Sequence, residues 1–162
     1  MRALVLYGSQ YGNTERIATV IADTLRTAGD VRLAKLDPTL PLNLDGTLAG
    51  IDLLILGSPT QGWQPTKAML PILAELSPER LRDIAVACFD TRFQMPRLLT
   101  GSAARAMANR LSQMGVALAM PPESFFVQHT EGPLRPGELG RAAVWARRLL
   151  DKVAPPQPVM ER

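Results

Sequence analysis

The stretch 3-ALVLYGSQYGNTERIATVIADTL-25 joins an apolar run to a turn with two glycines and then to an amphipathic segment. Leu4, Val5 and Leu6 do not alternate with polar residues, which is typical of a strand covered by helices on both faces. Apolar residues then recur at helical spacing, at Ile17, Val20, Ile21 and Leu25. We therefore expect a strand over 3–7, a tight turn, and a helix.

The same plan repeats along the chain. Further apolar runs predict strands at Val31–Leu36, Asp52–Gly57 and Ile84–Phe89, with a broken fifth at Val116–Met120 and Ser124–Val127. Amphipathic segments predict helices at Thr66–Leu76, Ala103–Met114 and Leu139–Val153, and Asp37–Gly50 is expected to be a long connection with one helical turn. Alternating strands and helices indicate an α/β fold with a mostly parallel sheet and helices on both faces.

Composition excludes several classes of protein. The 162 residues suffice for about one domain, and they are 46% apolar and 20% charged, as in soluble globular proteins. One cysteine (Cys88) and one histidine (His129) cannot form an internal disulfide or supply the ligands of a zinc site. We expect Cys88 to be buried and His129 exposed. Because Cys88 has no disulfide partner within the chain, the reducing cytoplasm is the expected location. No run approaches the roughly 20 apolar residues of a membrane span, and the first run is too short for a signal peptide.

The positive charge is unevenly distributed. The net charge of +3 is too small to indicate nucleic-acid binding. Residues 1–80 carry seven basic and eight acidic side chains, whereas residues 81–162 carry eleven and seven. No acid occurs between Asp90 and Glu123, a segment that holds Arg92, Arg97, Arg105 and Arg110.

Ligands of open parallel sheets bind at the carboxyl ends of the strands, which selects the loops Gly8–Thr14, Ser58–Pro65 and Asp90–Gly101. The first loop leads into a helix, whose free N–H groups form an anion site. It has no Lys or Arg, so a phosphate would be held by hydroxyls, an amide and backbone N–H groups. This composition excludes a Walker loop and a dinucleotide fingerprint. The alternative is that these residues only turn the chain and cap the helix.

Two of these loops carry a resemblance. Ser9-Gln10-Tyr11-Gly12-Asn13-Thr14 resembles the FMN phosphate loop of the flavodoxin family, with Tyr11 where Thr is usual. The segment Gly57–Trp63 resembles the loop that contacts the isoalloxazine ring in that family. The resemblance implies FMN as cofactor, a three-layer flavodoxin-like fold with strand order 2-1-3-4-5, and a domain over 1–153. It also implies a Gly62 peptide that reorients when the flavin is reduced. The proline-rich sequence Ala154-Pro155-Pro156-Gln157-Pro158 predicts a disordered tail over 154–162.

The third loop departs from the family, which typically has an acidic loop with a stacking Tyr there. Phe93 could replace that Tyr or pack inward. We expect the backbone of 90–93 to meet the pyrimidine edge of the flavin. An arginine such as Arg92 or Arg97 about 8 Å from flavin N1 would favour an anionic reduced flavin by roughly 2 kcal/mol. The protein should then be a weaker reductant than acidic flavodoxins, unless these arginines lie on a solvated helix face.

The expected cofactor site comprises Ser9, Gln10, Tyr11, Gly12, Asn13, Thr14, Pro59, Thr60, Gln61, Gly62, Trp63, Asp90, Thr91, Arg92 and Phe93, with no catalytic or metal-binding residue. The first hypothesis is an FMN electron carrier that acts with a redox partner protein, is a monomer or weak dimer, and does not insert into membranes. The alternatives are a flavodoxin-fold oxidoreductase acting on a quinone or protoporphyrinogen, and a flavin-free regulatory domain.

Overall fold

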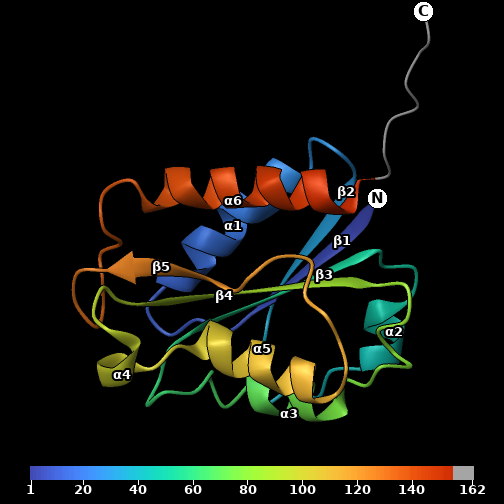
Figure 1. Ribbon diagram of the computed structural model, residues 1–162, viewed down its shortest axis with the longest axis horizontal. Helices are drawn as coiled ribbons and strands as arrows, with labels where there is room; N and C mark the ends of the chain where they lie inside the picture. Colours follow the sequence, from blue (N-terminus) through green and yellow to red (C-terminus); the bar gives the residue numbers. More distant parts are fainter. Residues whose placement is uncertain (155–162) are drawn as a thin grey trace, which may run out of the picture.

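A computed structural model describes residues 1–154 and contains one parallel sheet (Figure 1). The strands are β1 (Arg2–Tyr7), β2 (Asp30–Lys35), β3 (Leu53–Pro59), β4 (Ala85–Phe93) and β5 (Glu123–Val127). The helices are α1 (Asn13–Leu25), α2 (Leu44–Leu48), α3 (Met69–Glu75), α4 (Arg97–Thr100), α5 (Ala103–Gln113) and α6 (Glu138–Val153). The strand order β2-β1-β3-β4-β5, with parallel pairing throughout, confirms the predicted topology.

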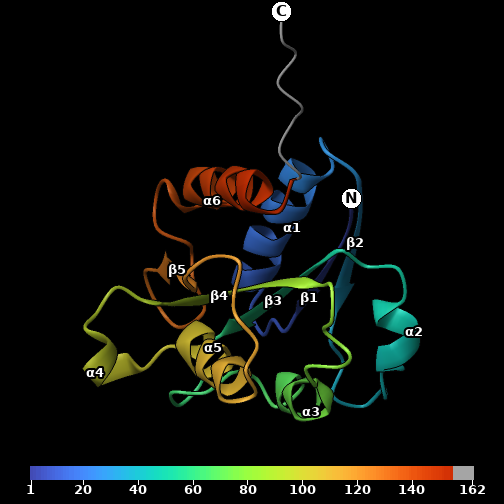
Figure 2. The same cartoon turned by 45° about the vertical axis from the view of Figure 1, so that its right-hand side comes forward.

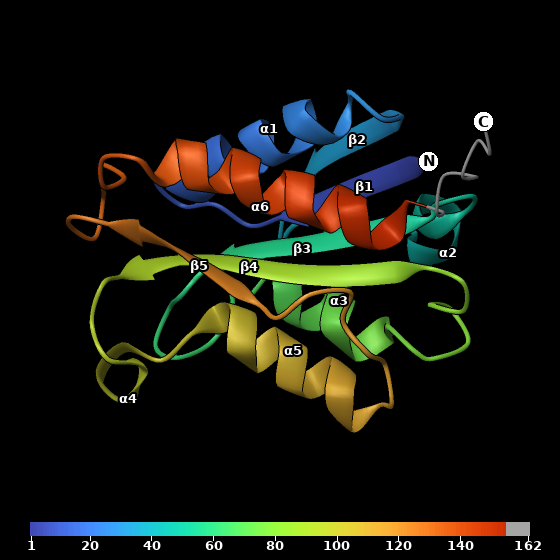
Figure 3. The same ribbon diagram turned by 45° about the horizontal axis from the view of Figure 1, so that its top comes forward.

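Helices cover both faces of the sheet, as Figures 2 and 3 show. Helices α1 and α6 pack on one face, and α2, α3 and α5 on the other. Within β1, Val5 points into the first of these cores, whereas Leu4 and Leu6 point into the second. Burial of both faces explains why these strands are apolar without alternation.

Four segments differ from the sequence prediction. The stretch 116–120 is not a strand; a single hydrogen bond joins it to β4, from Ala119 N to Val86 O. Helix α3 begins at Met69, because Thr66 N donates to Ser58 Oγ and is thereby held in the preceding turn. Strand β4 continues four residues past Phe89, since β5 pairs with it there, and the short helix α4 was not predicted.

An aromatic cluster fills the core between the sheet and α6. The rings of Phe89, Phe125 and Trp145 lie edge to face, with centroids 6.0–6.3 Å apart. Gly57 on β3 lies beside Phe89: a Cβ there would come within 2.1 Å of the ring. The absence of a side chain at residue 57 is therefore a packing requirement of the core.

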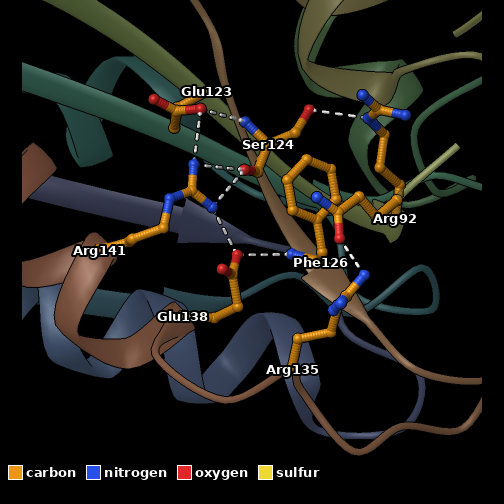
Figure 4. Close-up of polar contacts among 8 residues, drawn as sticks. Arg92, Glu123, Ser124, Phe126, Arg135, Glu138 and Arg141 are labelled. Atoms are coloured by element: carbon orange, nitrogen blue, oxygen red, sulfur yellow. Dashed lines mark hydrogen bonds and ion pairs between the residues drawn. The ribbon is translucent and has the colours of Figure 1, made fainter. Parts of the chain in front are cut away.

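Side chains of α6 cover the free edge of β5 (Figure 4). Phe126 N donates to Glu138 Oε2 at 2.8 Å, and Arg141 donates to Ser124 O at 3.2 Å and to Glu138 at 2.6 Å. Glu138 is only 6% exposed, so its charge is removed from water and paired with Arg141. These bonds occupy backbone groups that an unprotected edge strand would offer to another chain.

Two further predictions concern single residues. Cys88 is fully buried, as expected, and burial raises the pKa of its thiol to about 12. His129 is exposed, as expected.

Over 1–154, no helix is both long and apolar enough to cross a membrane, and no three His, Cys, Asp or Glu side chains gather as metal ligands would. The expected tail lies almost wholly in 155–162, outside the described residues.

Candidate functional site

A cavity of about 360 Å³ opens at the carboxyl ends of the strands. Thirteen of the fifteen residues expected for the cofactor site line it, from all three selected loops: Ser9, Gln10, Tyr11, Asn13, Thr14, Pro59, Thr60, Gln61, Gly62, Trp63, Thr91, Arg92 and Phe93. Gly12 and Asp90 do not contact it. The lining also includes Leu99, Thr100, Val127 and Thr130.

The first loop presents the N-terminus of α1 to this cavity. Gly12, the residue before the helix, has φ +87°, a left-handed conformation that favours glycine. Its N–H donates to Ser9 Oγ at 3.1 Å, which leaves the Ser9 hydroxyl proton free to bind a ligand. No side chain within 1–154 caps α1, so the first N–H groups of the helix remain available to an anion.

Hydrogen bonds hold the first loop against the other loops. Thr14 Oγ1 and Thr91 Oγ1 are 2.8 Å apart and buried. Gln61 Nε2 donates to Gln10 Oε1 at 2.7 Å. Asn13 Nδ2 donates to Glu131 O at 3.2 Å, so its amide braces the last loop rather than pointing freely into the cavity. The loops thus form a single, mutually supported wall.

The second loop is a tight turn. Gln61 and Gln64 exchange two backbone hydrogen bonds, at 2.8 and 3.0 Å, across Gly62 and Trp63. Gly62 has φ +52° and Trp63 has φ +74°, a pair of positive values typical of a type I′ turn. A positive φ at a tryptophan is unusual and marks local strain. The turn projects the Trp63 ring, which is 48% exposed, at the mouth of the cavity.

Asp90 does not line the cavity, but its side chain holds the second loop and the start of α5 in place. Its Oδ2 accepts from Ser102 Oγ at 2.6 Å, from Ala104 N at 3.0 Å and from Thr60 Oγ1 at 3.3 Å. The side chain is fully buried and caps the N-terminus of α5 while fixing the second loop. Fewer backbone groups of 90–93 are free to contact a flavin than the sequence predicted. The segment pairs with β5, and Thr91 O already accepts from Thr60 N.

Arg92 is not on a solvated helix face. It is 9% exposed, and its guanidinium donates to Ser124 Oγ at 3.0 Å and to Met95 O at 2.8 Å. It also lies over the Phe126 ring, 5.2 Å from the centroid (Figure 4). Burial lowers the pKa of this guanidinium from its usual value. Arg92 therefore contributes a fixed positive charge and ties the third loop to β5.

The lining residues that the sequence analysis missed belong to segments whose position depends on tertiary contacts. Leu99 and Thr100 lie on α4, which is too short to give a periodic pattern. Thr130 follows β5, and Val127 ends it. The rule that ligands bind at strand ends could have included the loop after β5, because this loop lies beside the other three.

The cavity joins two kinds of binding surface. The first loop offers a helix N-terminus with neutral hydroxyl donors and no Lys or Arg over residues 8–14, which fits an anionic group. The lining also offers the aromatic rings of Tyr11, Trp63 and Phe93, which fit a planar ring system. A ligand with an aromatic body and an anionic tail satisfies both.

Comparisons with known proteins agree with this fold. The model of the flavodoxin family matches residues 5–130. A search of curated proteins found no match. Among solved structures, oxidised flavodoxin 2 from Bacillus cereus superposes with a TM-score of 0.75 at 22% identity, covering 94% of this chain and 99% of that one. A flavodoxin from the domain Archaea gives 0.71 at 20% identity, covering 94% and 99%.

Rubredoxin oxygen:oxidoreductase from Desulfovibrio gigas also matches, with a TM-score of 0.71 at 18% identity over 95% of this chain and 37% of that one. At these identities the structural likenesses show the fold. The family model spans most of the chain, from β1 to the loop after β5. The chain therefore belongs to the flavodoxin family.

Proposed function

We propose that the cavity binds FMN and that the protein carries electrons between redox partners. The observation that carries this proposal is the meeting, in one cavity, of an uncapped helix N-terminus and three aromatic side chains. FMN has both matching parts, a terminal phosphate and a planar isoalloxazine ring. Family membership supports the same cofactor.

Each loop has a distinct role in this proposal. Residues 9–14 hold the phosphate through the Ser9 and Thr14 hydroxyls and the N–H groups of the first turn of α1. Residues 59–63 contact the ring, with Trp63 stacked on it. Thr91, Arg92 and Phe93 form the opposite wall, whereas Gly12 and Asp90 act by holding the loops in place.

The flavin supplies the redox chemistry when bound, and the chain binds it, orients it and sets its electrostatic environment. Arg92 is buried and charged beside the cavity, so it favours negative charge on the reduced ring. We therefore keep the expectation of a weaker reductant than acidic flavodoxins. We also propose that residues 1–153 form the FMN-binding domain and act with a separate redox protein.

An anaerobic reductive titration followed by absorbance tests the carrier role. We expect the FMN-loaded protein to take up electrons in two resolved one-electron steps and to react slowly with NADPH alone. Rapid bleaching by NADPH followed by turnover of a quinone would instead support the oxidoreductase. A protein that binds no FMN would support the flavin-free regulatory domain and contradict the proposal.

A further inference from the structure

Large apolar side chains gather around the mouth of the cavity. Tyr11, Trp63, Phe93 and Leu99 line it with exposed fractions of 36–62%, and Met95 and Leu98 are adjacent along the chain at 48% and 82%. We call these six residues the apolar rim. Single exposed apolar residues are common on protein surfaces, but a contiguous group beside a binding site marks an interaction surface.

Hydrogen bonds and close packing brace the part of the rim that contains α4 and Trp63. Arg92 Nη1 donates to Met95 O at 2.8 Å and to Thr100 Oγ1 at 3.3 Å, which fixes both ends of the segment that contains α4. Gly101 packs directly on Trp63, since a Cβ at residue 101 would come within 2.7 Å of the Trp63 Cα. Leu98 and Leu99 therefore project into solvent from a fixed backbone, which lowers the entropy cost of docking.

Positive charge lies beside the rim on the α4 side. Arg97 is exposed at the start of α4, and no acid occurs between Asp90 and Glu123. Arg135 approaches the same segment by donating to Gln94. The loop after β5 carries one acid, Glu131, whose backbone carbonyl accepts from Asn13 Nδ2.

We propose that the apolar rim and its flanking arginines are the docking surface for a redox protein that presents an apolar patch bordered by carboxylates. This inference rests on the proposed function. Complementary charge would steer the encounter, and the six apolar side chains would form the desolvated centre of the interface. The surface lies where the cavity opens, so a partner seated there would be next to the flavin ring.

A protein partner fits this surface better than a lipid bilayer. Helix α4 has four residues, too few for an amphipathic helix lying in a membrane interface. Recognition of anionic lipid typically uses a cluster of about 4–8 Lys and Arg, whereas the exposed cations that the structure ties to the rim segment are Arg97 on α4 and Arg135, which donates to Gln94.

Stopped-flow electron transfer from the reduced, FMN-loaded protein tests the proposal. Two haem proteins serve as probes, acidic cytochrome b5 and basic cytochrome c; each ferric haem takes one electron from the flavin and becomes ferrous. For cytochrome b5 we expect the second-order rate constant to fall at least about fivefold between about 20 and 300 mM salt. For cytochrome c it should rise or stay constant with salt.

Variants locate the surface. Leu98→Asp and Arg97→Glu should each lower the rate constant with cytochrome b5 about tenfold at low salt. Val144→Asp and Arg147→Glu are matched changes, apolar to acidic and Arg to Glu, at exposed positions on α6, on the other face of the sheet (Figure 3). Both variants should stay within about twofold of the parent protein. Oxidation by neutral benzoquinone should be unchanged in all four, because it needs no docking.

The outcomes separate the two proposals. A chain that does not load with FMN would overturn both. A loaded chain would overturn the docking surface alone if it transferred electrons equally fast in the α4 and α6 variants, or if its rate with cytochrome b5 rose with salt. Sedimentation with phosphatidylglycerol vesicles at physiological salt, lost in Leu98→Asp, would also overturn it in favour of a lipid surface.

Discussion

Gly12→Val should weaken FMN binding by about 10–150-fold. Gly12 has φ +87°, and no atom lies within 4 Å of the position a Cβ would take, so the substitution acts through the backbone alone. A β-branched residue at this φ is strained by roughly 1–2 kcal/mol and will relax toward negative φ. That rotation moves the N–H groups at the start of α1 away from the phosphate. Loss of one hydrogen bond to a charged group costs about 1.5–3 kcal/mol, which gives the stated range.

Gly115→Val is the matched control. Gly115 has φ +81°, equally open surroundings and a position just after α5, outside the cavity lining. Both variants should lose about 1–2 kcal/mol of unfolding free energy without FMN. Only Gly12→Val should lose affinity, as measured by calorimetric titration with FMN. Equal losses of affinity in the two variants would contradict a phosphate site at the start of α1.

Gly57→Ala should destabilise the fold by about 3 kcal/mol or more, near the upper end of overpacking effects. The added Cβ would lie 2.1 Å from Phe89 Cζ, and the Phe89 ring is fully buried. The ring cannot move away freely, because Phe125 and Trp145 pack against it at 6.0 and 6.2 Å. For a chain of this size, the melting temperature should fall by roughly 6–12 °C.

Gly140→Ala makes the same substitution where the structure has room. Gly140 lies on α6, and no atom lies within 4 Å of the added Cβ. Replacing a helical glycine by alanine should stabilise the protein by about 0.5–1 kcal/mol. Phe89→Leu should in turn relieve part of the Gly57→Ala penalty in the double variant. Denaturant unfolding measures all of these, and a Gly57→Ala protein as stable as the parent would refute the packing argument.

Much of the fold could be predicted because its signals are local. Leu4–Leu6 and the stripe from Ile17 to Leu25 carry the strand and helix patterns in contiguous residues. The sequence predictions were wrong where contacts between distant parts of the chain determine the ends of an element or whether it forms. Pro121 and Pro122 indicated an interruption, yet only the pairing of β5 with the end of β4 determines that the strand begins at Glu123. Helix α4 depends on the Arg92 contacts to Met95 and Thr100 and has no periodicity of its own.

The loops that form the site could also be predicted from the sequence, whereas the roles of single residues within them could not. Turn residues and the strand-end rule identified three loops that do line one cavity. The sequence did not distinguish residues that face the cavity from those that support it. Asp90 is a polar residue at a strand end, as a ligand contact would be, but its side chain is buried and accepts from the backbone of α5. Arg92 is not free either, because hydrogen bonds hold it to β5 and α4. Such roles depend on which way a side chain points across neighbouring strands.

The most direct test of the central claim is calorimetric titration of the flavin-free protein with FMN and, separately, with riboflavin. The two ligands share the ring and differ by the phosphate. If the uncapped start of α1 holds the phosphate and Trp63 and Phe93 contact the ring, both should bind, and FMN should bind at least about 100-fold more tightly. Equal affinities, or no binding of either ligand, would contradict an FMN site in this cavity.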